Sequence, residues 1–171
     1  MSSAESGPLP QSSPFWTFSL GYYRGAGVSE ACLELQDNCG VDVNVVLFLL
    51  WMASSQQRQV GTDEVRRLAD KVRPWQVDVI GPIRTLRRRL KSDAPLLDKG
   101  SAELFRTRIK AVELESERLQ QEAMYALASG IASEAAPSTT AAARASITAY
   151  QQALGRPLTP TAIDTLIGAL K

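Results

Sequence analysis

Two clusters of residues have types and spacing that could bind a ligand or support catalysis. The first surrounds a glycine turn and comprises Asp37, Gly40, Asp42 and Asn44. Carboxylate and amide oxygens can bind a cation, but a calcium loop needs more oxygen ligands and a terminal bidentate Glu, which is missing. The same residues are typical of a turn between two helices, because Gly40 can adopt positive φ and Asp42 can cap the next helix. We therefore interpret the cluster as a structural motif and predict no metal site.

The second cluster is basic, with Arg84, Arg87, Arg88 and Lys91 on one side of a helix. These cations could hold a phosphate, a nucleic-acid backbone or an acidic partner. Alternatively, they could pair with an acidic face on a later helix. That face comprises Glu113, Glu115, Glu117 and Glu122. Pairing is the favoured interpretation, because the interleaved aromatic residues of a single-strand binder are absent.

The chain has no histidine, which excludes Ser-His-Asp and Cys-His chemistry and histidine general bases. An enzyme would need Asp37, Asp42, Glu113 or Arg84 to converge on a cavity between helices. The sequence therefore favours a non-enzymatic protein, and we predict no cofactor.

Cys32 and Cys39 are seven residues apart in a predicted helix, so their Cα atoms would be roughly 10 Å apart, beyond disulfide reach. Both thiols should be reduced. The thiol of Cys39 lies near a helix C-terminus beside Asp37 and Asp42, which disfavours a thiolate. We expect it to be inert.

The 171 residues include 19 basic and 18 acidic side chains, so the net charge is +1. This balance argues against a general nucleic-acid or membrane-surface binder. Residues 1–13 lack the features of a signal peptide and are predicted to be a disordered tail. The longest apolar run, over 43–53, is too short to cross a bilayer, which needs about 20 residues. We therefore predict a cytoplasmic protein.

Helix caps and breakers place the elements that must position these clusters. The first three helices are predicted from Ser13-Pro14 to Gly25, over about 28–38 and over about 43–57. A fourth runs from a Thr62 cap to about Arg73, and a fifth follows it, kinked near Pro82 and broken at Ala94-Pro95. The last three are predicted from a Ser101 cap to about Ala128, over 139–154 and from Thr159-Pro160 onward.

One predicted helix, over about 43–57, is apolar on every side and includes Trp51, so we expect other helices to surround it. The fold class is predicted as all-α, a single-domain bundle of five to seven helices around this helix. Residues 14–130 are expected to form the core domain, and residues 131–171 a C-terminal helical appendage.

A seam of small and apolar residues runs along the helix after Ser101. It advances alternately by four and three residues through Phe105, Ile109, Val112, Ser116, Leu119, Ala123 and Ala126. This spacing suits either antiparallel packing within the bundle or contact with a second chain.

Three motifs resemble a proteobacterial family of small helical proteins of unknown function. They are FWxFSL from Phe15, LQDxxGxDVNxxLFxxW from Leu35 and PIRxLRRxLK from Pro82. The resemblance covers roughly residues 15–124 and implies a bacterial cytoplasmic protein. It implies no particular activity.

Taken together, these patterns favour a non-enzymatic interaction or regulatory module that presents a charged helix face to a protein partner or to a second copy of the chain. Nucleic-acid or anionic-ligand binding through Arg84, Arg87, Arg88 and Lys91 is the second hypothesis, and a carboxylate–arginine enzyme site is the third.

Overall fold

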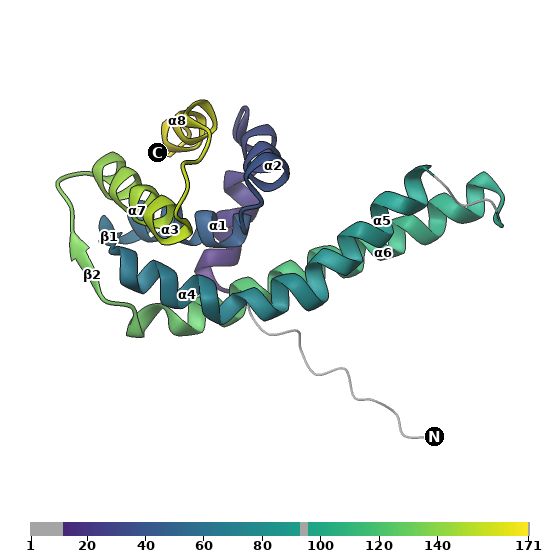
Figure 1. The fold of residues 1–171 in the computed structure, drawn as a ribbon, viewed down its shortest axis with the longest axis horizontal. Helices are drawn as coiled ribbons and strands as arrows, with labels where there is room; N and C mark the ends of the chain where they lie inside the picture. The colour runs from purple at the N-terminus through teal and green to yellow at the C-terminus, as the bar shows by residue number, and fades with distance from the viewer. Residues whose placement is uncertain (1–11, 93–95, 171) are drawn as a thin grey trace, which may run out of the picture.

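The computed structural model describes residues 12–92 and 96–170. Its long helices are α1 (Pro14–Tyr22), α2 (Val28–Cys39), α3 (Val43–Gln56), α4 (Thr62–Trp75), α5 (Gly81–Ser92), α6 (Lys99–Leu127), α7 (Thr139–Leu154) and α8 (Pro160–Gly168). Most of them form a body around α3, from which α5 and part of α6 project as a hairpin (Figure 1). The all-α, single-domain prediction is confirmed.

The turns around α2 follow the predicted chemistry. Ser13 caps α1, and its side chain accepts a hydrogen bond from the Trp16 amide. Gly27 and Gly40 adopt left-handed φ values of 75° and 56° on either side of α2. Asp42 then caps α3 by accepting a hydrogen bond from the Asn44 amide, at 2.9 Å.

α3 is the centre of the fold, as predicted. Its residues from Val43 to Ala53 are all buried. Trp51 lies 5% exposed among the rings of Phe15, Phe48 and Tyr125, with centroid distances of 5.5 to 5.6 Å. Even so, within the described part of the chain no helix has the length and hydropathy that a membrane span requires.

α4 ends at Trp75, two residues beyond the predicted end near Arg73, but the interruption expected between it and the next helix is absent. α4, the π-helical segment η1 (Gln76–Ile80) and α5 form one continuous rod, and Gln76 and Gly81 keep right-handed helical angles at both junctions. Pro74 lies in the last turn of α4, where its missing N–H removes a single helical hydrogen bond. The first residue of the rod also differs from expectation: Gly61 is the N-cap, and the Thr62 hydroxyl bonds to Gln152 Oε1 instead.

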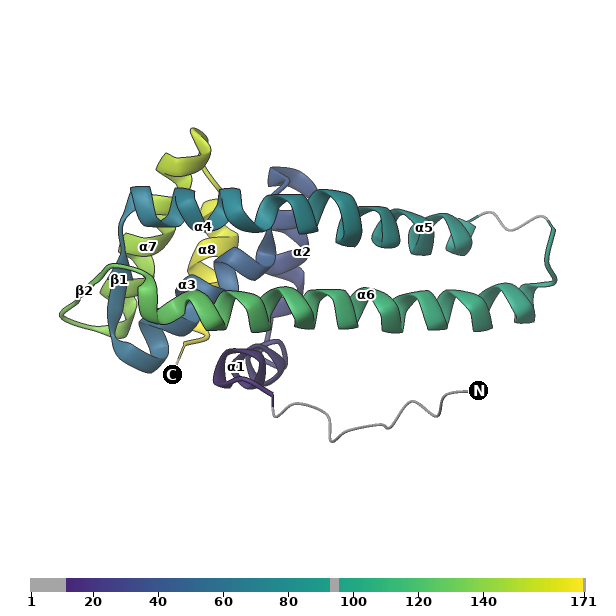
Figure 2. The same ribbon diagram turned by 90° about the horizontal axis from the view of Figure 1, so that it is seen from below.

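α6 runs antiparallel to this rod along its length (Figure 2). Its N-cap is Asp98, which accepts from the Ser101 amide at 3.0 Å, so the predicted Ser101 cap is wrong. The predicted break at Ala94-Pro95 falls outside the fully described residues.

The C-terminal segment packs on the rest of the body. After the 3₁₀ turn η2 (Ala128–Gly130), strand β2 (Ser133–Ala135) pairs antiparallel with β1 (Arg58–Val60), with Gln59 opposite Glu134. Three-residue strands have no sequence periodicity that could have predicted them. Buried side chains of α7 and α8 belong to the same hydrophobic cluster as those of α3, so the segment expected as an appendage shares the core.

Candidate functional site

The four residues of the predicted basic face have two different environments in the structure. Arg84 and Arg87 lie between α5 and α6 and are bound to carboxylates. Arg84 donates to Glu113 at 3.0 Å and to Glu117 at 2.8 Å, and Arg87 donates to Glu113 through two nitrogens. The Arg84 side chain is 13% exposed and that of Glu113 is 8% exposed. These two arginines are therefore components of a largely buried ion-pair cluster.

The outer two residues of the face are more accessible. Arg88 is half-exposed and donates to Asp37 on α2 at 2.8 Å. Lys91 is exposed further along the hairpin. The pairing interpretation thus applies to Glu113 and Glu117, whereas Glu115 bonds instead to Arg118 on its own helix.

The two carboxylates that bind Arg84 differ electrostatically. Burial raises the pKa of Glu113, but hydrogen bonds from Arg87 and Arg84 outweigh it, so the net pKa lies below the ordinary value. Burial raises the pKa of Glu117 above its ordinary value, because the opposing effect of Arg84 is smaller and Glu113 and Asp42 add negative charge. The arginines therefore outweigh the effect of burial on the ionised Glu113 carboxylate, whereas burial prevails at Glu117.

The glycine turn joins this cluster through a chain of buried amides. Gln121 donates to Asn44 Oδ1 at 2.8 Å, Asn44 donates to Gln120 Oε1 at 2.9 Å, and Gln120 donates to Asp42 Oδ2. Burial raises the pKa of Asp42 despite these hydrogen bonds. Asp42 therefore caps α3 with one carboxylate oxygen and anchors the amide chain with the other.

A cavity of about 350 Å³ connects the two clusters. It is lined by side chains of α1, α2, the start of α3, η1, α5 and α6, and it includes Asp42, Glu113 and Arg84. Three of the four residues required by the enzyme hypothesis thus converge on a cavity, whereas Asp37 is exposed and lies outside its lining. Across residues 12–92 and 96–170, no cluster of His, Cys, Asp and Glu could hold a metal ion.

Gln76 and Gln121 also line the cavity and Gln120 bonds to Asp42, although no sequence motif predicted these three glutamines as site residues. A usable signal was present, because Glu113, Ser116, Gln120 and Met124 follow one another at helical spacing and form the buried face of α6. Hydrophobic periodicity could not detect a buried face that is mostly polar.

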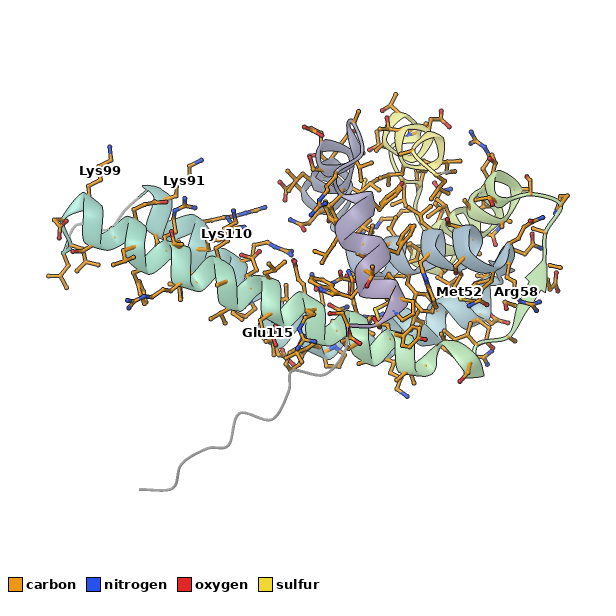
Figure 3. The ribbon with its side chains drawn as sticks, turned by 180° about the vertical axis from the view of Figure 1, so that it is seen from behind. Met52, Arg58, Lys91, Lys99, Lys110 and Glu115 are labelled. Carbon is orange, nitrogen blue, oxygen red and sulfur yellow. The ribbon has the colours of Figure 1, made fainter. Side chains whose placement is uncertain are left out.

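Two further surfaces of the α5–α6 hairpin, away from the ion-pair cluster, differ in charge and polarity. Successive helix residues are about 100° apart, which places Lys99 and Lys110 of α6 on one flank. Figure 3 shows Lys91 and Lys99 pointing to the same side of the hairpin. The opposite flank is apolar and carries Leu86, Phe105, Val112 and Leu119, which are 42%, 44%, 52% and 44% exposed.

Comparison with known proteins identifies the family. Residues 14–124 match the model of DUF2390, a family whose description reads "Protein of unknown function". The chain belongs to this family. The chain has no match among curated proteins or among solved structures. The DUF2390 region ends at Met124, so it contains α1 to α5 and nearly all of α6, with the hairpin, the ion-pair cluster and every residue that lines the cavity. The predicted resemblance to such a family, over roughly residues 15–124, is confirmed.

Proposed function

We propose that the chain is a non-enzymatic interaction module that pairs with a second copy of itself through the α5–α6 hairpin. The observation that carries this proposal is the exposure of Phe105, Val112 and Leu119, three α6 side chains spaced seven residues apart. Seven-residue spacing keeps apolar side chains on one stripe, which is how helices pack in pairs. The stripe is about 21 Å long from Phe105 to Leu119, at 1.5 Å per residue.

α5 extends the same surface. The bonds between Arg87 and Glu113 place Leu86 at about the level of Leu114, two residues along the antiparallel hairpin from Val112. Leu86 lies on the apolar flank and is 42% exposed. The hairpin therefore offers apolar side chains from two adjacent helices, which is half of a four-helix bundle.

A two-fold antiparallel arrangement centred on Val112 suits this surface. It brings Phe105 against Leu119 of the second copy and Leu86 near its own counterpart. In this register Arg108, at the outer edge of the stripe, is opposite position 116 of the second copy and therefore next to its Glu115. Both side chains are on exposed residues, and their opposite charges favour a second copy over an unrelated partner.

The ion pairs of Arg84 and Arg87 disfavour the nucleic-acid hypothesis, because their guanidinium groups would have to leave Glu113 and Glu117 to bind phosphate. Both cysteines are free. Reduced thiols support the cytoplasm as the place where this module acts.

Sedimentation velocity over a range of protein concentrations tests the proposal. We expect wild-type chain to dimerise and Val112→Glu to remain monomeric, because the substitution places a charge at the centre of the apolar contact. Leu114→Glu is the matched control, since Leu114 is 51% exposed on the opposite flank of the same helix. Circular dichroism would establish that both variants fold. A wild-type chain that stays monomeric at every concentration, or an equal loss of dimer in both variants, would overturn the proposal.

A further inference from the structure

Polar atoms without protein partners lie around the cavity between α1, α3, η1, α5 and α6. Among the described residues, no hydrogen-bond partner reaches Ser19 Oγ, Gln76 Oε1 or Gln121 Oε1, although each atom is buried. Ser19 is 1% exposed and Gln121 is 2% exposed, and all three residues line the same cavity. Buried polar groups in proteins are almost always hydrogen-bonded, so three such atoms around one cavity require hydrogen-bonding partners from outside the chain.

The amide chain determines what Gln121 offers to that ligand. The Asp42 carboxylate can only accept, so it fixes the Gln120 amide with its nitrogen toward Asp42 and its oxygen toward Asn44. Asn44 must then accept from the Gln121 nitrogen. Gln121 is therefore left with its carbonyl oxygen as the unused group, and it requires a donor.

The charges around the cavity point to the same kind of ligand. Asp42, Glu113 and Glu117 contribute three carboxylates, against the two guanidinium groups of Arg84 and Arg87. One negative charge remains when all five groups are ionised. A bound cation would neutralise it, whereas an anion would add to it.

The opening of the cavity is apolar. Its lining includes Leu20, Tyr23, Leu33 and Leu114, which are 45%, 40%, 53% and 51% exposed and therefore lie at the rim. The buried part holds the carboxylates and the amides. A matching ligand has a positively charged, donor-rich head and a short apolar body.

We propose that this cavity binds a small alkylammonium ion. Its three N–H groups donate to Gln121 Oε1, Ser19 Oγ and the Glu117 carboxylate, and its alkyl chain lies against the apolar rim. The site is independent of the apolar flank through which the hairpin is proposed to dimerise.

Three probes that share a four-carbon chain test the charge of the head group: butylammonium, 1-butanol and butyrate. Binding is followed by NMR through the indole N–H signal of Trp16, which lines the cavity, with the Trp75 signal as an internal reference outside it. We expect butylammonium alone to shift the Trp16 signal in a saturable manner. No shift with butylammonium up to its solubility limit, or equal shifts with all three probes, would overturn the proposal.

Two variants locate the binding groups. Glu117→Gln should weaken butylammonium binding by about tenfold or more, the usual effect of losing a hydrogen bond to a charged group. Glu103→Gln makes the same charge change on an exposed residue of the same helix, outside both the cavity and the proposed dimer contact, and should leave the affinity unchanged. Ser19→Ala removes a hydroxyl without a protein partner, so it should weaken binding without lowering the stability of the ligand-free protein. Equal affinities in Glu117→Gln and Glu103→Gln would contradict the assignment.

Discussion

The side-chain amide of Asn44, at the start of α3, donates a hydrogen bond of 2.9 Å to Gln120, in the C-terminal part of α6 and 76 residues away in sequence. Both residues are buried, at 7% and 3% exposure. Asn44 also accepts from Gln121, so a single side chain ties the central helix to two successive residues of α6. The α3–α6 contact is therefore specified by polar geometry as well as by apolar packing.

Replacing Asn44 should be costly. Asn44→Leu leaves the Gln120 oxygen and the Gln121 nitrogen buried without partners, and each orphaned group costs about 1–3 kcal/mol. We expect the free energy of unfolding in urea to fall by about 3 kcal/mol. Asn38→Leu on the exposed side of α2 is the control, where the change should stay within about 0.5 kcal/mol. Equal losses in the two variants would contradict the role given to the amide chain.

Neutralising Glu113 should destabilise the protein at neutral pH. Its folded pKa is lowered, so its contribution is fully present above the unfolded pKa of about 4.3 and is lost as pH falls through the folded pKa. Glu113→Gln breaks bonds to two largely buried arginines and should cost about 3 kcal/mol at pH 7. Urea unfolding across pH should show the wild-type advantage shrinking in acid. A loss of stability that stays constant down to the acid limit would contradict this electrostatic account.

Glu117 should behave in the opposite way. Its folded pKa is raised, so the folded state binds the proton more tightly and the ionised carboxylate costs stability above the folded pKa. Glu117→Gln removes that cost, so at pH 7 stability should be unchanged or higher. Below the unfolded pKa the difference should vanish. Glu113→Gln is the same substitution four residues away, so the free energies of unfolding of the two variants are compared at pH 7. A comparable loss of stability in both would refute the opposite roles given to Glu113 and Glu117.

The helices were largely predictable because their caps are local. The Ser13 and Asp42 caps, the left-handed Gly40 and the all-round apolar α3 can be predicted within a few residues of sequence, and the structure has them. The helix after Pro74 was also predicted, but its continuity with α4 was not, because that continuity depends on packing against α6, which is distant in sequence.

The site was harder to predict, for a related physical reason. α6 buries Glu113, Ser116, Gln120 and Gln121, so its inner face is polar and its most hydrophobic seam lies on the exposed flank. Burial of such residues depends on partners supplied by Asp42, Asn44, Arg84 and Arg87, which no local pattern reveals. The basic residues were found by their spacing, but their pairing partners could be resolved only in three dimensions.

Gly40 should resist substitution for a backbone reason. Its φ of 56° lies in the left-handed region, and a Cβ there would meet only the Arg156 guanidinium at 3.6 Å, an ordinary contact. Gly40→Ala should therefore cost about 1–2 kcal/mol of stability from backbone strain alone. Gly168→Ala, at a site with open space and no positive φ, serves as the control in urea unfolding and should cost nothing. Tolerance of alanine at both positions would show that the turn relaxes.

Charge reversal tests the antiparallel register of the proposed dimer. Arg108→Glu places like charges opposite each other at both symmetry-related edges, and two exposed pairs changed in this way should weaken dimerisation by about tenfold. The double variant Arg108→Glu with Glu115→Arg restores opposite charges and should recover the wild-type dissociation constant in sedimentation equilibrium. Both effects should diminish at high salt, because the pairs are exposed. In a parallel dimer Arg108 would lie far from Glu115 of the second copy, so failure of the double variant to recover dimerisation would reject the antiparallel arrangement while leaving the apolar stripe as the contact.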